Sequence, residues 1–217
     1  MATVASPFGL LPRWHPSGQT RSNAYDNVLL SGMTTPIYQG TPVKLVIGAG
    51  AAISGVTVPV GQMVIAPVAA TTDAFLGVFD GVEYVDSNGR GQYSKQWPAG
   101  LALAAGTIPR VWIFDDPANI YEIQFDGALN TGTNAYNFYG KQAVFTGTDI
   151  SATAPAGNST TGMSACRASA TLTATGSQGQ LRIVNLPGQP INTIQDAFPT
   201  EYVQIARHQF VNPQTSL

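Results

Sequence analysis

The sequence has 217 residues, a formal net charge of −2 and a charged fraction of only 10%. An average globular chain carries about 25% charged residues, so we expect a surface that is polar but largely uncharged. The few Lys and Arg residues are scattered and form no basic stripe, which argues against direct nucleic-acid binding. A surface with few ions is readily covered by another protein, because few charges must lose their hydration.

A single cysteine, Cys166, excludes an intramolecular disulfide and an all-cysteine metal site. We expect Cys166 to behave as a small buried hydrophobe. The N-terminal stretch has no basic region, and prolines and a glycine interrupt its apolar run, so it does not resemble a secretory signal. Because no window approaches 18 consecutive apolar residues, no membrane partner is expected. These features predict a protein kept in a cytoplasm or released without secretion.

The first 32 residues combine prolines, glycines and well-separated aromatic side chains. Proline and glycine at this density oppose a regular helix, and no clean two-residue alternation is present. Disordered tails are poor in aromatic residues, so we expect residues 1–32 to form an extended arm that lies on a partner or on its own domain. The expected anchors of this arm are Phe8, Leu10, Leu11, Trp14 and Tyr25.

Residues 33–217 show short segments rich in Val, Ile, Tyr and Phe, separated by turn residues. Such segments stand at 36–47, 56–68 and 76–85, and this spacing is typical of all-β proteins. No amphipathic pattern longer than two helical turns is present. We therefore predict an all-β fold with little helix, either a β-sandwich or a β-barrel, with a jelly-roll-like arrangement.

The segments 110–114 and 120–125 are predicted to form a hairpin around the turn Asp115 to Asn119. In the second segment, Tyr121, Ile123 and Phe125 alternate with Glu122 and Gln124. Side chains alternate between the two faces of a strand. We therefore expect one apolar face and one wet face.

The stretch from 145 to 164 is rich in Ser, Thr and Gly and is predicted to be a loop. A further hairpin is expected from 165–173 and 180–186, and a last strand from 201–210. The chain is therefore either one β domain over residues 33–217 or two small β lobes divided near 146–164.

The turn Asp86 to Gly91, between the segments of a predicted hairpin at 76–100, partly matches a calcium-binding loop. Its first residues match such a loop, but Arg90 takes a ligand position and Trp97 replaces the final glutamate. A cation would therefore bind poorly there. We interpret 76–100 as a structural hairpin, whose faces offer Tyr84, Tyr93 and Trp97 for a subunit contact.

The best enzymatic candidates are the adjacent acids Asp115 and Asp116, as in a glycosidase. Neighbouring residues on a strand point to opposite faces, and acids in a proline-containing turn are usually solvated. A Ser-His-Asp arrangement would need His15 or His208, near either end of the chain, to enter a cleft. We predict no enzyme, and no catalytic, cofactor-binding or metal-binding residue.

Four blocks of sequence taken together resemble tailed-bacteriophage virion proteins, namely the capsid decoration or cement proteins of podovirus-like and related phages. The blocks are SPFGLLPRWHPSG, TTPIYQGTPVKL, LGVFDGVEYVDSNGRGQYSKQWPAG and VWIFDDPANIYEIQFDG. The resemblance covers the chain to about residue 130 and lies in the order of the blocks. The family offers no catalytic motif that could be carried over to this chain.

The resemblance implies a β-structured protein on the exterior of an icosahedral shell, assembled in the cytoplasm of a bacterial host. Its expected partners are the major capsid protein and further copies of itself, with a homotrimer favoured and a dimer as the alternative. Two other functions stay open. One is another virion role, such as a minor capsid protein, a head fibre base or a tail protein. The other is a carbohydrate-binding or hydrolytic β domain that uses Trp97, Trp112 and the nearby acids.

Overall fold

The computed structural model describes residues 4–26, 29–30, 36–47, 51–53, 56–58, 63–129, 147–151, 157–173, 178–185 and 196–211. This part of the chain contains strands β1 to β19 and no helix. The all-β prediction is therefore confirmed. The strands lie in two large sheets and three two-stranded ones.

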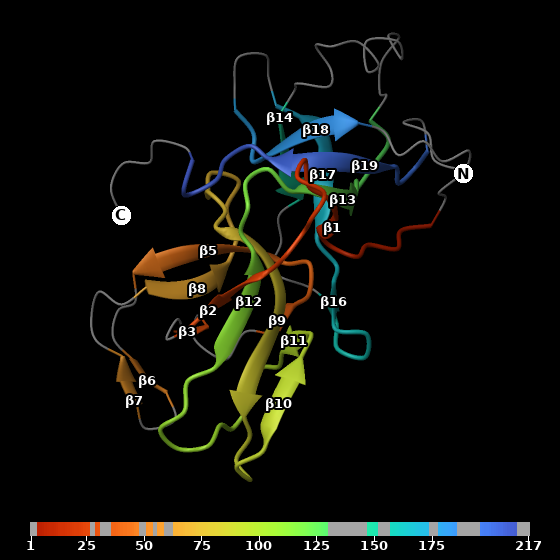
Figure 1. The fold of residues 1–217 in the computed structure, drawn as a ribbon. Coiled ribbons are helices and arrows are strands. Elements are labelled where there is room, and N and C mark those ends of the chain that lie inside the picture. Colours follow the sequence, from red (N-terminus) through yellow and green to blue (C-terminus); the bar gives the residue numbers. More distant parts are fainter. Residues whose placement is uncertain are drawn as a thin grey trace.

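The upper sheet of Figure 1 has six strands in the order β1-β13-β19-β18-β14-β17. Its ladders are antiparallel throughout. The bounds of these strands are β1 Leu11–Trp14, β13 Ile120–Gln124, β14 Gly147–Ser151, β17 Arg167–Leu172, β18 Leu181–Asn185 and β19 Thr200–Ile205.

The lower sheet has seven strands, in the order β2-β12-β9-β5-β8-β3 with β10 paired to β9 (Figure 1). Only β3 and β8 run parallel. The bounds are β2 Asn23–Tyr25, β3 Leu29–Leu30, β5 Pro42–Ile47, β8 Met63–Pro67, β9 Gly77–Val85, β10 Gly91–Ser94 and β12 Arg110–Phe114. The small sheets join β4 Ile37–Tyr38 to β11 Gln96–Trp97, β6 Ala51–Ile53 to β7 Val56–Val58, and β15 Gly157–Asn158 to β16 Met163–Ser164.

Each large sheet has its own hydrophobic cluster. The upper cluster contains Tyr121 and Ile123 of β13, and the lower cluster contains Val111 and Ile113 of β12. Strand β9 serves both, because Val78 belongs to the upper cluster while the next residues along the strand pack in the lower one. The two sheets therefore pack on one another as an open β-sandwich, and the barrel alternative is not what the described strands form.

The predicted hairpin of residues 110–125 is wrong, although both of its strands exist. Strand β12 pairs with β2 and β9, whereas β13 pairs with β1 and β19 in the other sheet. The turn at 115–119 carries the chain from the lower sheet to the upper sheet. The two strands separate because their apolar side chains belong to different clusters.

The wet face predicted for residues 120–125 is also wrong. Glu122 is 6% exposed and Gln124 is 5% exposed. Both are covered by the N-terminal segment: Arg13 forms an ion pair with Glu122, and the Ser6 amide donates to Gln124 Oε1 at 2.9 Å. The N-terminal segment covers the second face of β13, so the polar side chains on that face need hydrogen-bond partners. The two contacts from Arg13 and Ser6 supply these partners.

The predicted loop at 145–164 and the hairpin at 165–186 both need correction. Residues 147–151 form β14, which lies between the two strands expected to pair: Thr148 is opposite Leu172 of β17 on one side and Leu181 of β18 on the other. Small polar residues can form a central strand when both neighbours supply backbone hydrogen bonds. The last predicted strand, 201–210, is present as β19 but ends at Ile205. Glu201, Val203 and Ile205 lie on its buried face.

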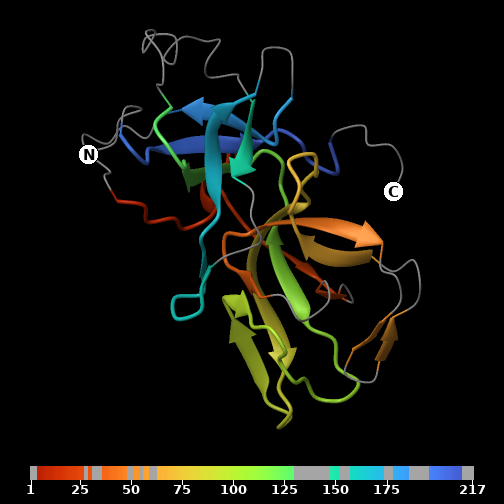
Figure 2. The same ribbon diagram turned by 180° about the vertical axis from the view of Figure 1, so that it is seen from behind.

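After β14 the chain descends to the lower sheet and returns, and Figure 2 shows residues 157–164 reaching toward β11. There the Gln39 amide donates to Gly162 O and the Ser164 amide to Gln39 O, both at 2.9 Å. Gly157 lies against the ring of Tyr38, where a Cβ would overlap the ring atoms. Residues 157–164 thus pack against the small sheet of β4 and β11.

The hairpin at 76–100 has the expected structural form. Strands β9 and β10 pair antiparallel, with Val85 opposite Gly91. In the turn, Asp86 Oδ1 accepts the amides of Asn88 and Arg90, both at 2.9 Å, and Gly89 has a φ of +77°. These hydrogen bonds, the one from Arg90 first, lower the pKa of Asp86. The Asp86 carboxylate therefore holds its own turn together.

Candidate interaction surface

The N-terminal segment lies on its own domain over most of its described length. Strand β1 adds to the edge of the upper sheet, with Leu11 opposite Glu122 and Trp14 opposite Ile120. Leu10 is fully buried in the upper cluster, and its amide donates to Gly40 O at 2.9 Å. Of the two positions foreseen for the arm, on a partner or on its own domain, Leu10 takes the second.

The other expected arm anchors differ in how much surface they offer. Phe8 and Leu11 are half-buried. Tyr25 packs against the lower cluster, and its hydroxyl donates to Asp115 Oδ2 at 2.5 Å. Burial is the largest cause that raises the pKa of Tyr25. Trp14 is 45% exposed, so it is the arm residue with the most aromatic surface available to a partner.

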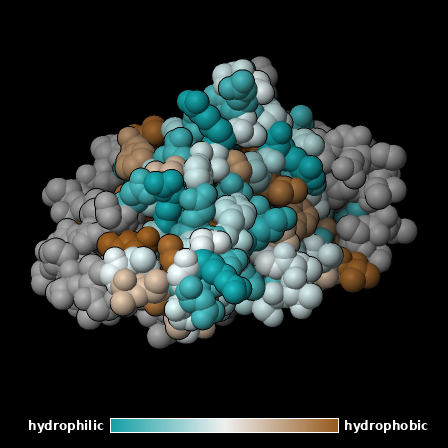
Figure 3. All heavy atoms as spheres, turned by 60° about the horizontal axis from the view of Figure 1, so that its bottom comes forward, coloured by the Kyte–Doolittle hydropathy of each residue, from teal (hydrophilic) through white to brown (hydrophobic). Residues whose placement is uncertain are grey.

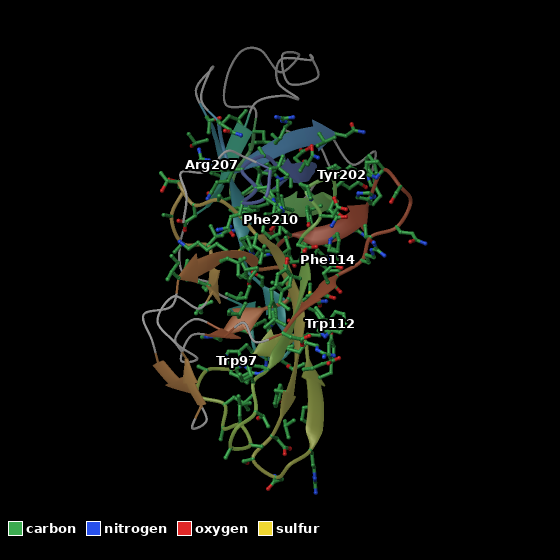
Figure 4. All side chains as sticks on the ribbon, turned by 60° about the vertical axis from the view of Figure 1, so that its left-hand side comes forward. Trp97, Trp112, Phe114, Tyr202, Arg207 and Phe210 are labelled. Carbon is green, nitrogen blue, oxygen red and sulfur yellow. The ribbon has the colours of Figure 1, made fainter. Side chains whose placement is uncertain are left out.

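The hairpin residues also separate into buried and exposed members. Trp97 is fully buried in the lower cluster, and its ring meets that of Tyr84 edge-on at a centroid distance of 6.0 Å. Figure 4 shows Trp97, on β11 of a small sheet, and Trp112, on β12 of the lower sheet. Tyr93 is 55% exposed, and its hydroxyl lies over Gly81, where a Cβ would be 2.5 Å from the oxygen. Tyr93 is therefore the hairpin residue that can meet a partner.

Sequence reasoning missed a group near the end of the described chain, the C-terminal patch, formed by Ile47, Phe210 and Val211. These side chains are 52%, 61% and 62% exposed. The segment that carries Phe210 and Val211 is held beside β5, the strand of Ile47, because Gln209 binds Leu45, accepting from its amide at 2.8 Å and donating to its carbonyl at 3.0 Å. No local pattern predicts this group, because Phe210 stands at the end of the last predicted strand.

Among the residues that the structure describes, the exposed large apolar side chains stand in separate areas. Val4, 72% exposed, and Trp14 stand on the N-terminal segment, Tyr93 on the hairpin, and the C-terminal patch beside β5. On the face shown in Figure 3, brown apolar atoms are likewise divided among polar and neutral ones. Figure 4 places Phe210 between the levels of the two large sheets. This distribution suits contacts in several directions.

An open groove of about 520 Å³ runs beside the hairpin, between β10 and the start of β12. Tyr84 and Tyr93 line it together with the charged group Asp26, Glu83 and Arg110. Arg110 Nε is 2.6 Å from Asp26 Oδ1, and a second nitrogen is 3.8 Å from Glu83. These charges are exposed and already paired with one another. The groove therefore combines aromatic and charged side chains, as the polar rim of a protein–protein interface does.

A hydrogen-bonded chain of Ser17, His15 and Asp116 has the connectivity of a catalytic triad. Ser17 Oγ is 2.5 Å from His15 Nδ1, and His15 Nε2 is 3.3 Å from Asp116 Oδ2. However, His15 Nδ1 also accepts the backbone amide of Ser17 at 3.0 Å. The Nδ1 atom is therefore already occupied by a backbone amide of its own loop. We interpret the chain as a lock that holds the loop 15–22 onto the turn 115–119.

The acids and tryptophans of the glycosidase alternative do not form a sugar cleft of the kind expected. Asp115 accepts from Asn23 Nδ2 at 2.6 Å and from the Tyr25 hydroxyl, so both of its oxygens are engaged within the chain. Asp116 accepts from the Ala118 amide at 2.8 Å as well as facing His15. Trp97 has no exposed surface on which a sugar ring could stack.

Glu201 and His208 are buried, and Cys166 is half-buried. Glu201 has no exposed surface, and neither of its carboxylate oxygens has a hydrogen-bond partner among the described residues. Burial raises the pKa of Glu201 to about 9. Burial also raises the pKa of the Cys166 thiol and lowers that of His208. All three are therefore neutral near pH 7, and Cys166 is kept as an unreactive thiol.

No group of three or more His, Cys, Asp or Glu side chains in the described part of the chain is placed to hold a metal ion. The same residues contain no helix long and apolar enough to cross a bilayer. Comparison with protein-family models, with curated proteins and with solved structures found no match.

Proposed function

We propose that this protein is a virion structural protein that binds the outer surface of a phage capsid as a decoration or cement protein. Bound there, it stabilises the shell against the pressure of the packaged genome. The observation that supports this most is the combination of a 10% charged chain with exposed apolar side chains in three separate places. Such a surface suits several simultaneous contacts with neighbouring subunits of a lattice.

The expected contact residues are the exposed ones. Trp14 on β1, Tyr93 on β10 and Phe210 of the C-terminal patch each present a large side chain. Aromatic side chains commonly dominate the energy of protein interfaces. Fully burying one contributes about 1.5–3 kcal/mol. Leu10 and Trp97 contribute indirectly, by holding Trp14 and the hairpin in place from inside the domain.

The N-terminal segment needs little folding when the protein binds, because β1 is already paired with β13. An arm that ordered only on the shell would lose part of its binding energy to that ordering. Here the buried Leu10 and the ion pair of Arg13 with Glu122 fix the segment in advance. Preorganisation of this kind strengthens binding without adding contacts.

Stabilisation of the shell follows from linkage. A ligand that binds only the assembled shell stabilises it by about 2.7 kcal/mol per site at one hundred times Kd. We further propose that the protein acts as a homotrimer, with a dimer as the alternative, and that its partner is the major capsid protein. Contact with several capsomers at once raises the apparent affinity by about 10²–10⁴.

Co-sedimentation with capsids that lack the protein tests the proposal. The intact protein should pellet with the capsids at a fixed ratio, and Trp14→Ser should bind about tenfold more weakly, since 1.4 kcal/mol is a tenfold change. Thr171→Ala, at an exposed position of β17, is the matched control and should bind like the intact protein. No pelleting of the intact protein would contradict the proposal. Imaging of the particle separates decoration from a minor capsid, fibre or tail role.

A further inference from the structure

Strand β10 is an exposed edge of the lower sheet. Figure 1 and Figure 2 both show it at the outer side of β9, with no further strand beyond it. Among the described strands it pairs only with β9, and Gly91, Gln92 and Tyr93 are exposed. The backbone groups on the open side of an edge strand can bind another strand. A further strand can therefore add to the sheet at β10.

The register of the hairpin fixes which backbone groups point to the open side. The Asp86 amide donates to Arg90 O at 2.9 Å, so these opposite residues form a hydrogen-bonded pair. Along an antiparallel ladder, hydrogen-bonded and non-hydrogen-bonded pairs alternate. Counted from this pair, Gly91 and Tyr93 belong to non-hydrogen-bonded pairs with β9. Each of them therefore directs one donor and one acceptor away from β9.

Strand β10 lacks most of the features that protect the other sheet edges. Strand β1 contains Pro12 and a register shift, and Ala168 O on the outer side of β17 accepts the Asp126 amide at 3.0 Å. Proline, charge, bulges and covering segments are the usual means by which an edge is kept from pairing. Strand β10 has no proline, no charged side chain and no register shift. Only its length of 4 residues limits the pairing.

Gly91 stands in this strand without a reason from its own chain. Its φ lies outside the left-handed region, and a Cβ at this position would meet no atom within 4 Å. Glycine weakens a strand, and it often marks a bulge or a close approach of another backbone. The regular register with β9 excludes a bulge. The glycine therefore fits a close approach from the open side.

We propose that β10 pairs with β10 of a second copy of this chain, antiparallel and with the two Gln92 residues opposite each other. In this register Gly91 of each copy lies opposite Tyr93 of the other, so every outward backbone group is paired. The missing side chain of Gly91 leaves room for the Tyr93 ring, which is 55% exposed. Aromatic side chains stabilise glycines on neighbouring strands in this way.

The same register is compatible with the charges beside the strand. Arg90 of one copy faces Ser94 of the other, and Lys95 faces Gly89, so no like charges are opposed. The two Gln92 amides can each donate and accept a hydrogen bond. An interface about a two-fold axis must be self-complementary, and this pairing meets that requirement. A second copy is therefore the occupant that the edge fits.

The contact is expected to be weak in solution. Stable interfaces bury about 1,200–2,000 Å², and two such short strands alone cover little area. Copies held side by side on a common surface would pair more strongly, because their effective concentration is higher. The pairing has two-fold symmetry, so it produces the dimer that was named above as the alternative to the trimer. It does not rest on the capsid role.

Disulfide cross-linking tests the register. Opposite residues of a non-hydrogen-bonded pair have Cα atoms about 4.5 Å apart, and disulfides span about 4.4–6.8 Å. Gln92→Cys in a Cys166→Ala background, oxidised with glutathione disulfide, should therefore give a linked dimer on a non-reducing gel. Arg90→Cys in the same background is the matched control, because its two Cα atoms would lie about 14 Å apart. Gln92→Cys should cross-link at least about tenfold faster at micromolar protein, since a formed contact holds the thiols at millimolar effective concentration.

Two results would overturn the proposal. One is a Gln92→Cys protein that forms no linked dimer, or one that cross-links no faster than Arg90→Cys, as random collision would give. The other is a Gln92→Cys protein that links to an added capsid protein but not to itself, which would assign the edge to that partner. Fluorescence of the buried Trp97 shows whether each variant is folded. Co-sedimentation of the native protein with capsids tests the proposed function separately.

Discussion

Replacing Glu201 with glutamine should stabilise the protein by an amount that depends on pH. Glu201 lies on β19 opposite Ile123, fully buried and with both oxygens unpartnered among the described residues. Burial raises its pKa from 4.5 to about 9. The folded protein therefore keeps the proton over a range in which the unfolded chain releases it. The contribution of protonated Glu201 to the free energy of unfolding is fully present below about pH 4.5 and is lost as the pH rises toward 9.

The size of the effect follows from the pKa shift. Each pH unit between the two pKa values removes about 1.4 kcal/mol of stability. From pH 5 to pH 7 the loss is about 3 kcal/mol, a large part of a typical stability of about 5–15 kcal/mol. Glutamine is similar in shape and never ionises. The stability gap between Glu201→Gln and the native protein should therefore widen by that amount over these two pH units.

Urea unfolding followed by tryptophan fluorescence measures this difference, with the buried Trp97 as a reporter. Curves are recorded for both proteins at pH 5, 6 and 7. Glu83→Gln, whose side chain is 43% exposed, is the matched control and should show no such widening. A difference in the free energy of unfolding between Glu201→Gln and the native protein that stays the same at pH 5, 6 and 7 would show that the buried carboxyl of Glu201 is not neutral.

Two further substitutions test the packing of the N-terminal segment. Leu10→Ala should destabilise the protein by about 2–5 kcal/mol, measured as a lower urea midpoint, whereas an unchanged midpoint would place Leu10 outside the core. Gly9→Ala should also destabilise it, because Gly9 has a φ of +75° and a Cβ would lie 2.5 Å from Gly40 O. A melting temperature equal to that of the native protein would contradict this backbone geometry.

The sequence identified most strands but not their partners. Val, Ile, Tyr and Phe mark β9, β12, β13 and β19 clearly, because these residues favour strands wherever the strands pair. The sheet to which a strand belongs depends on which hydrophobic cluster buries its apolar side chains. These clusters bring together residues that are far apart in the sequence. The pairing of β12 with β13 was therefore expected from proximity and is wrong. Strand β14 has the sequence GTDIS, with Ile150 as its one apolar side chain, and carries no strand pattern.

The candidate surface was predictable in composition but not residue by residue. Low charge and spaced aromatics predict large side chains that the chain itself or a partner covers. The tertiary fold decides which of these side chains the chain itself buries. Leu10 and Trp97 are buried in this way, whereas Trp14 and Tyr93 stay exposed. The C-terminal patch depends on Gln209 binding Leu45, a contact across 164 positions of sequence that no local pattern reveals.

The proposed role is tested most directly by the temperature at which full phage heads release their DNA. Heads stripped of the protein are heated with and without added protein, and release is followed with a DNA-binding dye. The account predicts that the added protein raises the release temperature until its sites are filled, and that Trp14→Ser requires a higher concentration for the same effect. An unchanged release temperature at saturating protein would contradict the role as a stabiliser of the shell.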